Sequence, residues 1–110
     1  MKNNICFESI EISQEKAIKK GLKLSHLLII DYLSQFFSSG YAKFIVKGKK
    51  DKYYYITLNK ILSDLPILGI KKRRLQTLIQ ELENLKIIIR YSKQNAPNIY
   101  IKLNLSPILP

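Results

Sequence analysis

Four polar side chains between residues 73 and 84 have the types and the spacing of a surface that reads DNA bases. They are Arg73, Thr77, Gln80 and Asn84, with Gln76 beside them. At about 100° per residue, the four share one side of a helix, opposite an apolar stripe. In a major groove, arginine pairs with guanine, glutamine or asparagine pairs with adenine, and a threonine methyl contacts the methyl group of thymine. The pattern therefore predicts a helix that reads base edges.

Four consecutive cations, Lys71, Lys72, Arg73 and Arg74, open this helix. Positive charge at a helix N-terminus opposes the macrodipole, at a cost of about 0.3 to 1 kcal/mol per charge. DNA phosphates would compensate this cost, because a recognition helix enters the groove between two rows of phosphates. A solvated helix face with a chance basic run is the alternative, and it would explain most such runs.

Two further basic segments are candidates for phosphate contacts. One is the connector of a predicted hairpin, and the other is a predicted wing near the C-terminus. Their candidate residues are Lys47, Lys49, Lys50 and Lys52 in the connector and Arg90 and Lys93 in the wing. The connector suits a phosphate strand or an RNA, and an ordinary solubilising loop tip explains it equally well.

Composition places these residues in one small, basic, globular domain. The 110 residues carry 19 Lys+Arg against 8 Asp+Glu, a formal net charge of +11, and are 46% hydrophobic. Such a chain is too apolar to be disordered, and it contains no apolar run of about 18 residues that would cross a membrane. Cys6 is the lone cysteine, so we expect no disulfide and a cytoplasmic location.

An enzyme needs a convergent set of reactive groups, and the sequence offers none. His26 is the one histidine and has no cysteine within ligand spacing, so we expect no metal site and no cofactor. Glu81 and Glu83 project about 160° apart on their helix, which does not suit a metal-dependent nuclease. Phosphate-binding and nucleophile motifs are missing too. We therefore expect a binding protein that is not an enzyme.

The hydrophobic periodicity predicts an α+β fold. An extended piece over 10–13 precedes a short helix over 14–20 and a nearly all-apolar helix capped by Ser25, which should lie at the centre of the core. Strands over 42–46 and 53–58 form the basic hairpin, and Tyr53, Tyr54 and Tyr55 lie on the second strand. Their alternation sends at least one tyrosine into the core, which we favour over stacking on unpaired bases. A helix capped by Asn59 runs to Leu65.

After a turn at 66–69, leucines at helical spacing predict the amphipathic helix over 71–85, followed by a β-hairpin over 86–92 and 99–105. We assign residues 1–105 to a single domain and 106–110 to a loose C-terminal tail. The predicted elements follow the order of a winged helix-turn-helix domain with three to four helices, a basic hairpin and a C-terminal β-wing. That order is helix, helix, hairpin, short helix, long helix, hairpin.

The chain resembles the N-terminal winged-helix domain of phage and plasmid replication initiators and replisome organisers. The resemblance rests on residues 53–66, on Lys71 to Leu85 and on the following Lys86-Ile87-Ile88-Ile89. The resemblance extends over roughly residues 8–105. It implies that residues 59–65 form the positioning helix, 71–85 the recognition helix and 93–98 the wing tip. The chain departs from the family where Asn84-Leu85-Lys86 replaces the usual glycine before the strand. Such initiators usually continue into a second domain, whereas we expect the 110 residues here to form one domain.

These observations favour a protein that binds double-stranded DNA in phage or plasmid replication initiation. A transcriptional repressor would use the same physics at a different site. A phage-encoded inhibitor that docks its basic face on an acidic host protein or a ribonucleoprotein is the alternative from another class, and RNA remains a candidate partner. A palindromic target would require a homodimer, and the sequence leaves the oligomeric state open.

Overall fold

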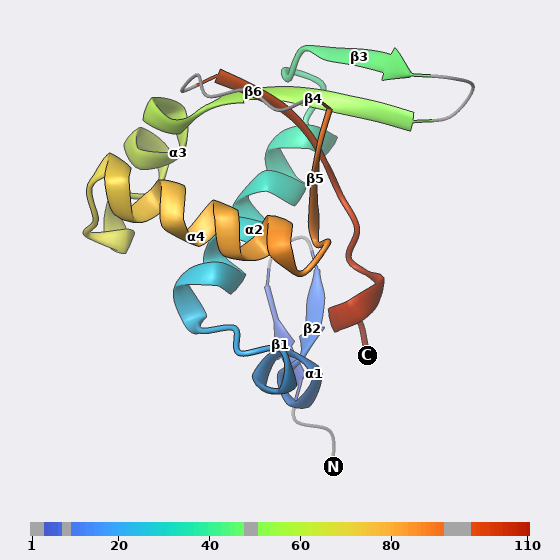
Figure 1. The fold of residues 1–110 in the computed structure, drawn as a ribbon, viewed down its shortest axis with the longest axis vertical. Helices are drawn as coiled ribbons and strands as arrows, with labels where there is room; N and C mark the ends of the chain where they lie inside the picture. Colours follow the sequence, from blue (N-terminus) through green and yellow to red (C-terminus); the bar gives the residue numbers. More distant parts are fainter. Residues whose placement is uncertain (1–3, 8–9, 48–50, 92–97) are drawn as a thin grey trace.

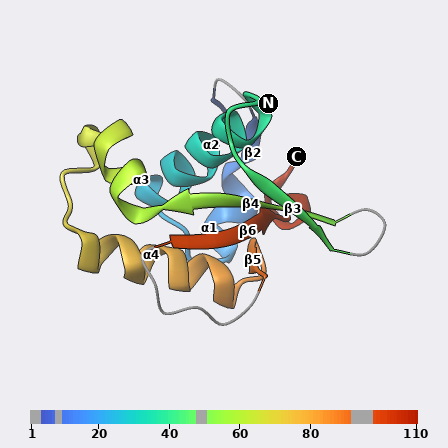
Figure 2. The same ribbon diagram turned by 90° about the horizontal axis from the view of Figure 1, so that it is seen from above.

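The computed structural model describes residues 4–7, 10–47, 51–91 and 98–110, without the side chains of Lys47, Asn98 and Ile99. Within these ranges the fold is mixed α+β, as the sequence predicts, with four α-helices and two antiparallel sheets. Strands β3, β4 and β6 lie above helices α2, α3 and α4 in Figure 1, and the β1–β2 hairpin and α1 lie at the opposite end. Figure 2 shows β3, β4 and β6 crossing in front of the helices.

The N-terminal part contains one element that periodicity did not reveal. Strand β1 (Asn4–Cys6) pairs with β2 (Glu11–Ser13), which is the extended piece expected over 10–13. Helix α1 (Gln14–Lys19) follows directly, and the Ser13 hydroxyl caps it by accepting a hydrogen bond from the Lys16 N–H at 3.2 Å. Gly21, at φ 74°, turns the chain out of this helix.

Helix α2 (Leu24–Ser38) forms the centre of the core, as its composition predicts. Ile29, Ile30 and Leu33 are fully buried. The expected cap at Ser25 is wrong. The cap is Lys23 and the helix begins at Leu24, two residues earlier than a Ser25 cap would place it, because the His26 ring turns back and accepts the Lys23 N–H.

The four-stranded sheet consists of β3 (Phe44–Lys47), β4 (Asp51–Thr57), β5 (Ile88–Arg90) and β6 (Asn98–Leu103), in the order β3-β4-β6-β5. Both predicted hairpins are present, and the sheet joins them because β6 also pairs with β4. Strand β4, which precedes the helix pair α3–α4, is therefore hydrogen-bonded to β6 and not to β5, the strand that directly follows the pair.

Helix α3 (Leu58–Asp64) and helix α4 (Lys72–Asn84) are joined by a 3-10 turn over Pro66–Leu68. Asn59 does not cap α3. Thr57 does, by accepting the Lys60 N–H at 3.0 Å, so the helix begins at Leu58. Gly69, at φ 61°, ends the turn in the left-handed conformation that glycine adopts without strain.

At the end of α4, Lys86 takes the position in which the replication initiators usually have glycine. Lys86 adopts φ 64°, donates its N–H to the Glu83 carbonyl at 3.0 Å, and lets Ile87 donate to the Leu82 carbonyl at 3.0 Å. This is the two-bond Schellman cap, with a lysine in the position that usually holds glycine. The helix therefore ends in a regular cap, but the left-handed backbone of Lys86 costs conformational energy that glycine would avoid.

The C-terminal segment is not the loose end that we expected. Residues Ser106–Ile108 form a 3-10 turn, Ile108 is fully buried, and the Lys16 ammonium donates to the Leu109 carbonyl at 2.7 Å. The segment lies against α1 and completes the core there.

Candidate nucleic-acid interface

Helix α4 turns its apolar stripe inward and its polar side outward. Leu75, Leu78 and Leu82 are fully buried, and Ile79 is nearly so. The four predicted base-reading residues, Arg73, Thr77, Gln80 and Asn84, are all exposed, as are Arg74 and Gln76. The sequence-predicted polar side is therefore an accessible surface of the folded chain.

The cationic run sits at the start of this helix. Lys71 is the residue before the first turn, Lys71, Arg73 and Arg74 are exposed, and Lys72 is half-buried. The first turn contains no acidic residue. None of the four cations forms an ion pair with another described residue, so the described part of the fold does not offset their charge at the positive end of the helix.

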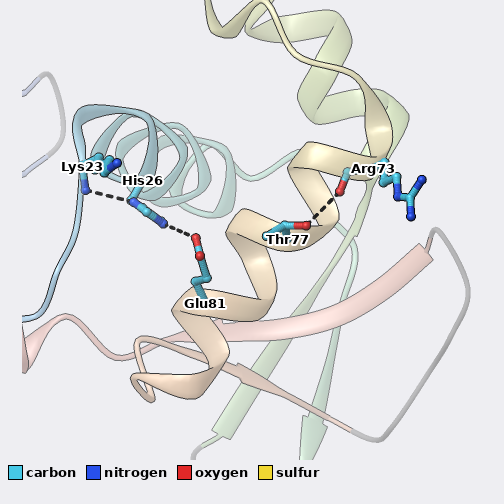
Figure 3. A network of polar contacts seen from close by, with 5 residues as sticks. All are labelled: Lys23, His26, Arg73, Thr77 and Glu81. Carbon is cyan, nitrogen blue, oxygen red and sulfur yellow. Dashed lines mark hydrogen bonds and ion pairs between the residues drawn. The ribbon is translucent and has the colours of Figure 1, made fainter.

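Two hydrogen bonds fix side chains along the outer side of α4. The Thr77 hydroxyl donates to the Arg73 carbonyl at 3.2 Å, and the Gln80 amide donates to the Asn84 side-chain oxygen at 3.0 Å. Figure 3 shows Thr77 tied back to the helix while the Arg73 guanidinium extends away from it. Thr77 is exposed and its hydroxyl is engaged with the backbone, which leaves its methyl group as the part of the side chain that could contact a thymine. Gln80 and Asn84 still have unused donors and acceptors for a ligand.

Glu81 brings a negative charge to the same side of the helix, and sequence reasoning assigned it no role there. Its Oε1 lies 2.9 Å from Nε2 of His26. Nδ1 of His26 accepts the Lys23 N–H at 2.9 Å, so the ring proton is on Nε2 and is donated to Glu81. His26 therefore joins the start of α2 to α4 and holds the carboxylate toward α2 (Figure 3). No periodicity signals this contact, which links residues 55 positions apart.

The remaining predicted cations do not gather on α4 in the described part of the chain. Arg90 forms an ion pair with Glu83, in which its Nε donates to Oε1 at 3.0 Å, and both side chains are largely buried. We predicted that Arg90 contacts nucleic acid, but its charge is already balanced by Glu83 inside the fold. The Lys52 ammonium lies 4.7 Å from the centre of the Phe44 ring. Lys47 ends β3, and Lys49, Lys50 and Lys93 lie outside the described residues.

The described residues offer little reactive chemistry. They contain no group of three or more His, Cys, Asp or Glu side chains arranged to hold a metal ion. An open hollow of about 350 Å³ is lined by residues of α2, β4 and β6, and the carboxylate in its lining, Asp51, is paired with Lys102 at 3.1 Å. None of the helices described here has the length and apolar character needed to traverse a bilayer.

Comparisons with protein-family models, with curated proteins and with solved structures find no match to this chain. The fold and the surface of α4 therefore carry the functional argument by themselves.

Proposed function

We propose that this protein is a winged-helix DNA-binding protein that places α4 in the major groove of a duplex. The observation that carries the proposal is the outer side of α4, where exposed arginine, threonine and amide side chains follow a cationic first turn. The cations suit two rows of phosphates, and the side chains beyond them suit base edges. Arg73, at the boundary between the two sets, can reach either.

The chain topology supports the winged helix. Strand β4 leads into α3, the turn leads into α4, and β5 and β6 follow as a hairpin, with β6 between β4 and β5 in the sheet. This arrangement presents the second helix of a helix-turn-helix pair on the surface with a hairpin next to it. The resemblance to replication initiators of phages and plasmids suggests an origin as the target, and a repressor would use the same surface at an operator.

The salt dependence of duplex binding tests the proposal. We would first select bound sequences from random duplexes and then titrate one of them at several salt concentrations. If Lys71, Lys72 and Arg74 each neutralise one phosphate while Arg73 contacts a base, log K falls against log salt with a slope near −2.7, at about −0.9 per phosphate. A flat dependence, or selection of no duplex at all, overturns the proposal.

Arg73→Ala tests the assignment to α4. It should reduce discrimination between the selected site and a scrambled duplex by about 1 to 3 kcal/mol. Lys19→Ala is the matched control, because Lys19 is an exposed cation on α1 paired only with Glu15 among the described residues. Equal losses from the two variants would mean that α4 does not read the site.

A further inference from the structure

The side of the four-stranded sheet that faces away from the helices carries a cluster of tyrosines. Alternation along the paired strands places two rows of side chains across this side. The first row comprises Lys43, Tyr55, Tyr100 and Tyr91, and the second comprises Ile45, Tyr53, Lys102 and Ile89. We call these eight residues the tyrosine face.

The rings of the tyrosine face contact one another in pairs. The centres of Tyr55 and Tyr100 lie 5.2 Å apart, and those of Tyr53 and Tyr91 lie 5.4 Å apart. The Lys102 ammonium lies 5.6 Å from the centre of the Tyr53 ring. Tyr54 points the other way and stacks on Phe37 of α2 at 4.6 Å, which identifies the inner side of the sheet.

Solvent reaches the tyrosine face. In Figure 2, β4 and β6 lie in front of the helices, so α2, α3 and α4 are all on the other side of the sheet. Tyr91 is 40% exposed, Lys43 is exposed, and Tyr55 and Tyr100 are half-buried. Tyr53 is buried beneath its neighbours and supports them.

The chemistry of this face matches an unpaired nucleic-acid strand. Proteins that bind single strands stack the unpaired bases on aromatic side chains. A recurrent platform of this kind is a four-stranded antiparallel sheet with aromatic residues on its two central strands. Here the central strands are β4 and β6, and they supply Tyr53, Tyr55 and Tyr100. Lys43, which is exposed, provides positive charge next to the rings, whereas the charge of Lys102 is balanced by Asp51 at 3.1 Å.

We propose that the tyrosine face binds single-stranded nucleic acid by stacking bases on Tyr91, Tyr100 and Tyr55, with Lys43 next to the backbone. This surface is separate from the outer side of α4, and it does not depend on duplex binding. A duplex does not suit it, because paired bases are stacked on each other and present only their edges.

The test is the affinity of the intact protein for labelled 12-nucleotide thymidine and uridine strands, measured by fluorescence anisotropy. Tyr91 is the variant of choice because it is the most exposed ring of the cluster. Tyr91→Ala should weaken binding by about 5- to 150-fold, the range for loss of one stacked base, whereas Tyr91→Phe keeps the ring and should stay close to wild type. Quenching of tyrosine emission by the bound strand gives a second readout that does not depend on a variant.

The outcomes separate this proposal from duplex binding. Arg73→Ala should leave single-strand affinity within about twofold, even where it removes recognition of a duplex. A tighter complex with the uridine strand would identify RNA as the ligand, and a tighter complex with the thymidine strand would identify DNA. If neither strand binds, or if Tyr91→Ala and Tyr91→Phe behave alike, the tyrosine face is not a stacking platform.

Discussion

His26 donates a hydrogen bond from Nε2 to Glu81 Oε1 at 2.9 Å, although the histidine is almost fully buried and the glutamate is half exposed. The contact fixes α4 relative to α2, and α2 is the most buried helix of the fold. It also holds the Glu81 carboxylate toward α2, whereas the Arg73 guanidinium extends away from the helix (Figure 3).

Replacing His26 should therefore destabilise the fold. His26→Ala removes the acceptor of the Lys23 N–H and the donor to Glu81, and it leaves a small cavity. We expect the free energy of unfolding to fall by about 1 to 3 kcal/mol in urea denaturation. Glu81→Gln keeps an oxygen acceptor for His26 and should cost much less. Equal losses from the two variants would show that the charge of Glu81, and not the histidine ring, carries the stability.

Thr77 should read a thymine through its methyl group. The Thr77 hydroxyl is bound to the Arg73 carbonyl, and Thr77→Val keeps the methyl group, whereas Thr77→Ser loses it. On a selected duplex we expect Val to bind like wild type and Ser to bind about 1 kcal/mol more weakly, the value of one buried methyl group. Deoxyuridine in place of the contacted thymine should abolish the difference between the two variants. A Ser variant that binds as well as wild type on the thymine duplex would assign recognition to other side chains.

Asp64 makes the fold sensitive to acid. The Tyr32 hydroxyl donates to Asp64 at 2.6 Å and Lys60 pairs with it at 3.1 Å, and these contacts hold the pKa of Asp64 below its usual value. Burial and the same carboxylate raise the pKa of Tyr32. Because the pKa of Asp64 is lower in the folded than in the unfolded chain, its contribution to stability is complete above about pH 4 to 5. It is lost as the pH falls through the lowered pKa.

Unfolding measured by urea between pH 2 and pH 6 checks this dependence. Tyr32→Phe removes the largest cause of the lowered pKa, so its stability should change less with pH than that of wild type across this range. Asp64→Asn should be flatter still. Parallel pH profiles for all three proteins would contradict the assignment.

Lys86 offers a stabilising substitution. Its φ of 64° costs a non-glycine residue about 1 kcal/mol or more, and glycine avoids that cost at the price of a more flexible unfolded chain. Lys86→Gly should therefore raise the free energy of unfolding by about 0.5 to 1 kcal/mol. Lys86→Ala separates conformation from charge, since it removes the charge and keeps the strained backbone. If Ala stabilises as much as Gly, charge removal explains the gain.

The C-terminal segment should contribute to stability through one side chain. Ile108→Ala empties a fully buried site, and a loss of about 2 to 5 kcal/mol is expected in thermal or urea unfolding. Leu109→Ala, next to it and 37% exposed, should cost far less. Similar small losses from both would mean that the segment detaches readily in solution.

Strong local signals made much of this fold predictable. The stripe of Leu75, Leu78 and Leu82 defined α4 and its exposed side, and the alternation around Ile101 defined β6. Helix starts were less predictable, because Thr57 outcompetes Asn59 and a histidine ring replaces the expected serine cap. Such choices depend on side-chain geometry and not on residue type alone.

Contacts between segments that are distant in the sequence could not be predicted from local patterns. The partners of Arg90 and Glu81 follow from how α4 packs on β5 and α2, and the burial of Ile108 follows from a turn with no period of its own. Likewise, the tyrosine face appears only once β6 is paired with β4, because its rings come from β4, from β6 and from Tyr91, which follows β5.

The pairing of β4 with β6 has a consequence for how the protein moves. These two strands bring together both ends of the segment that contains α3, α4 and β5, so we expect the sheet and the two helices to open together. Amide protons of β6 and α4 should then exchange with solvent in one cooperative event. A ligand that stabilises the pairing of β4 with β6 would therefore also stabilise α4 on the other side of the sheet, although the ligand and α4 would not touch.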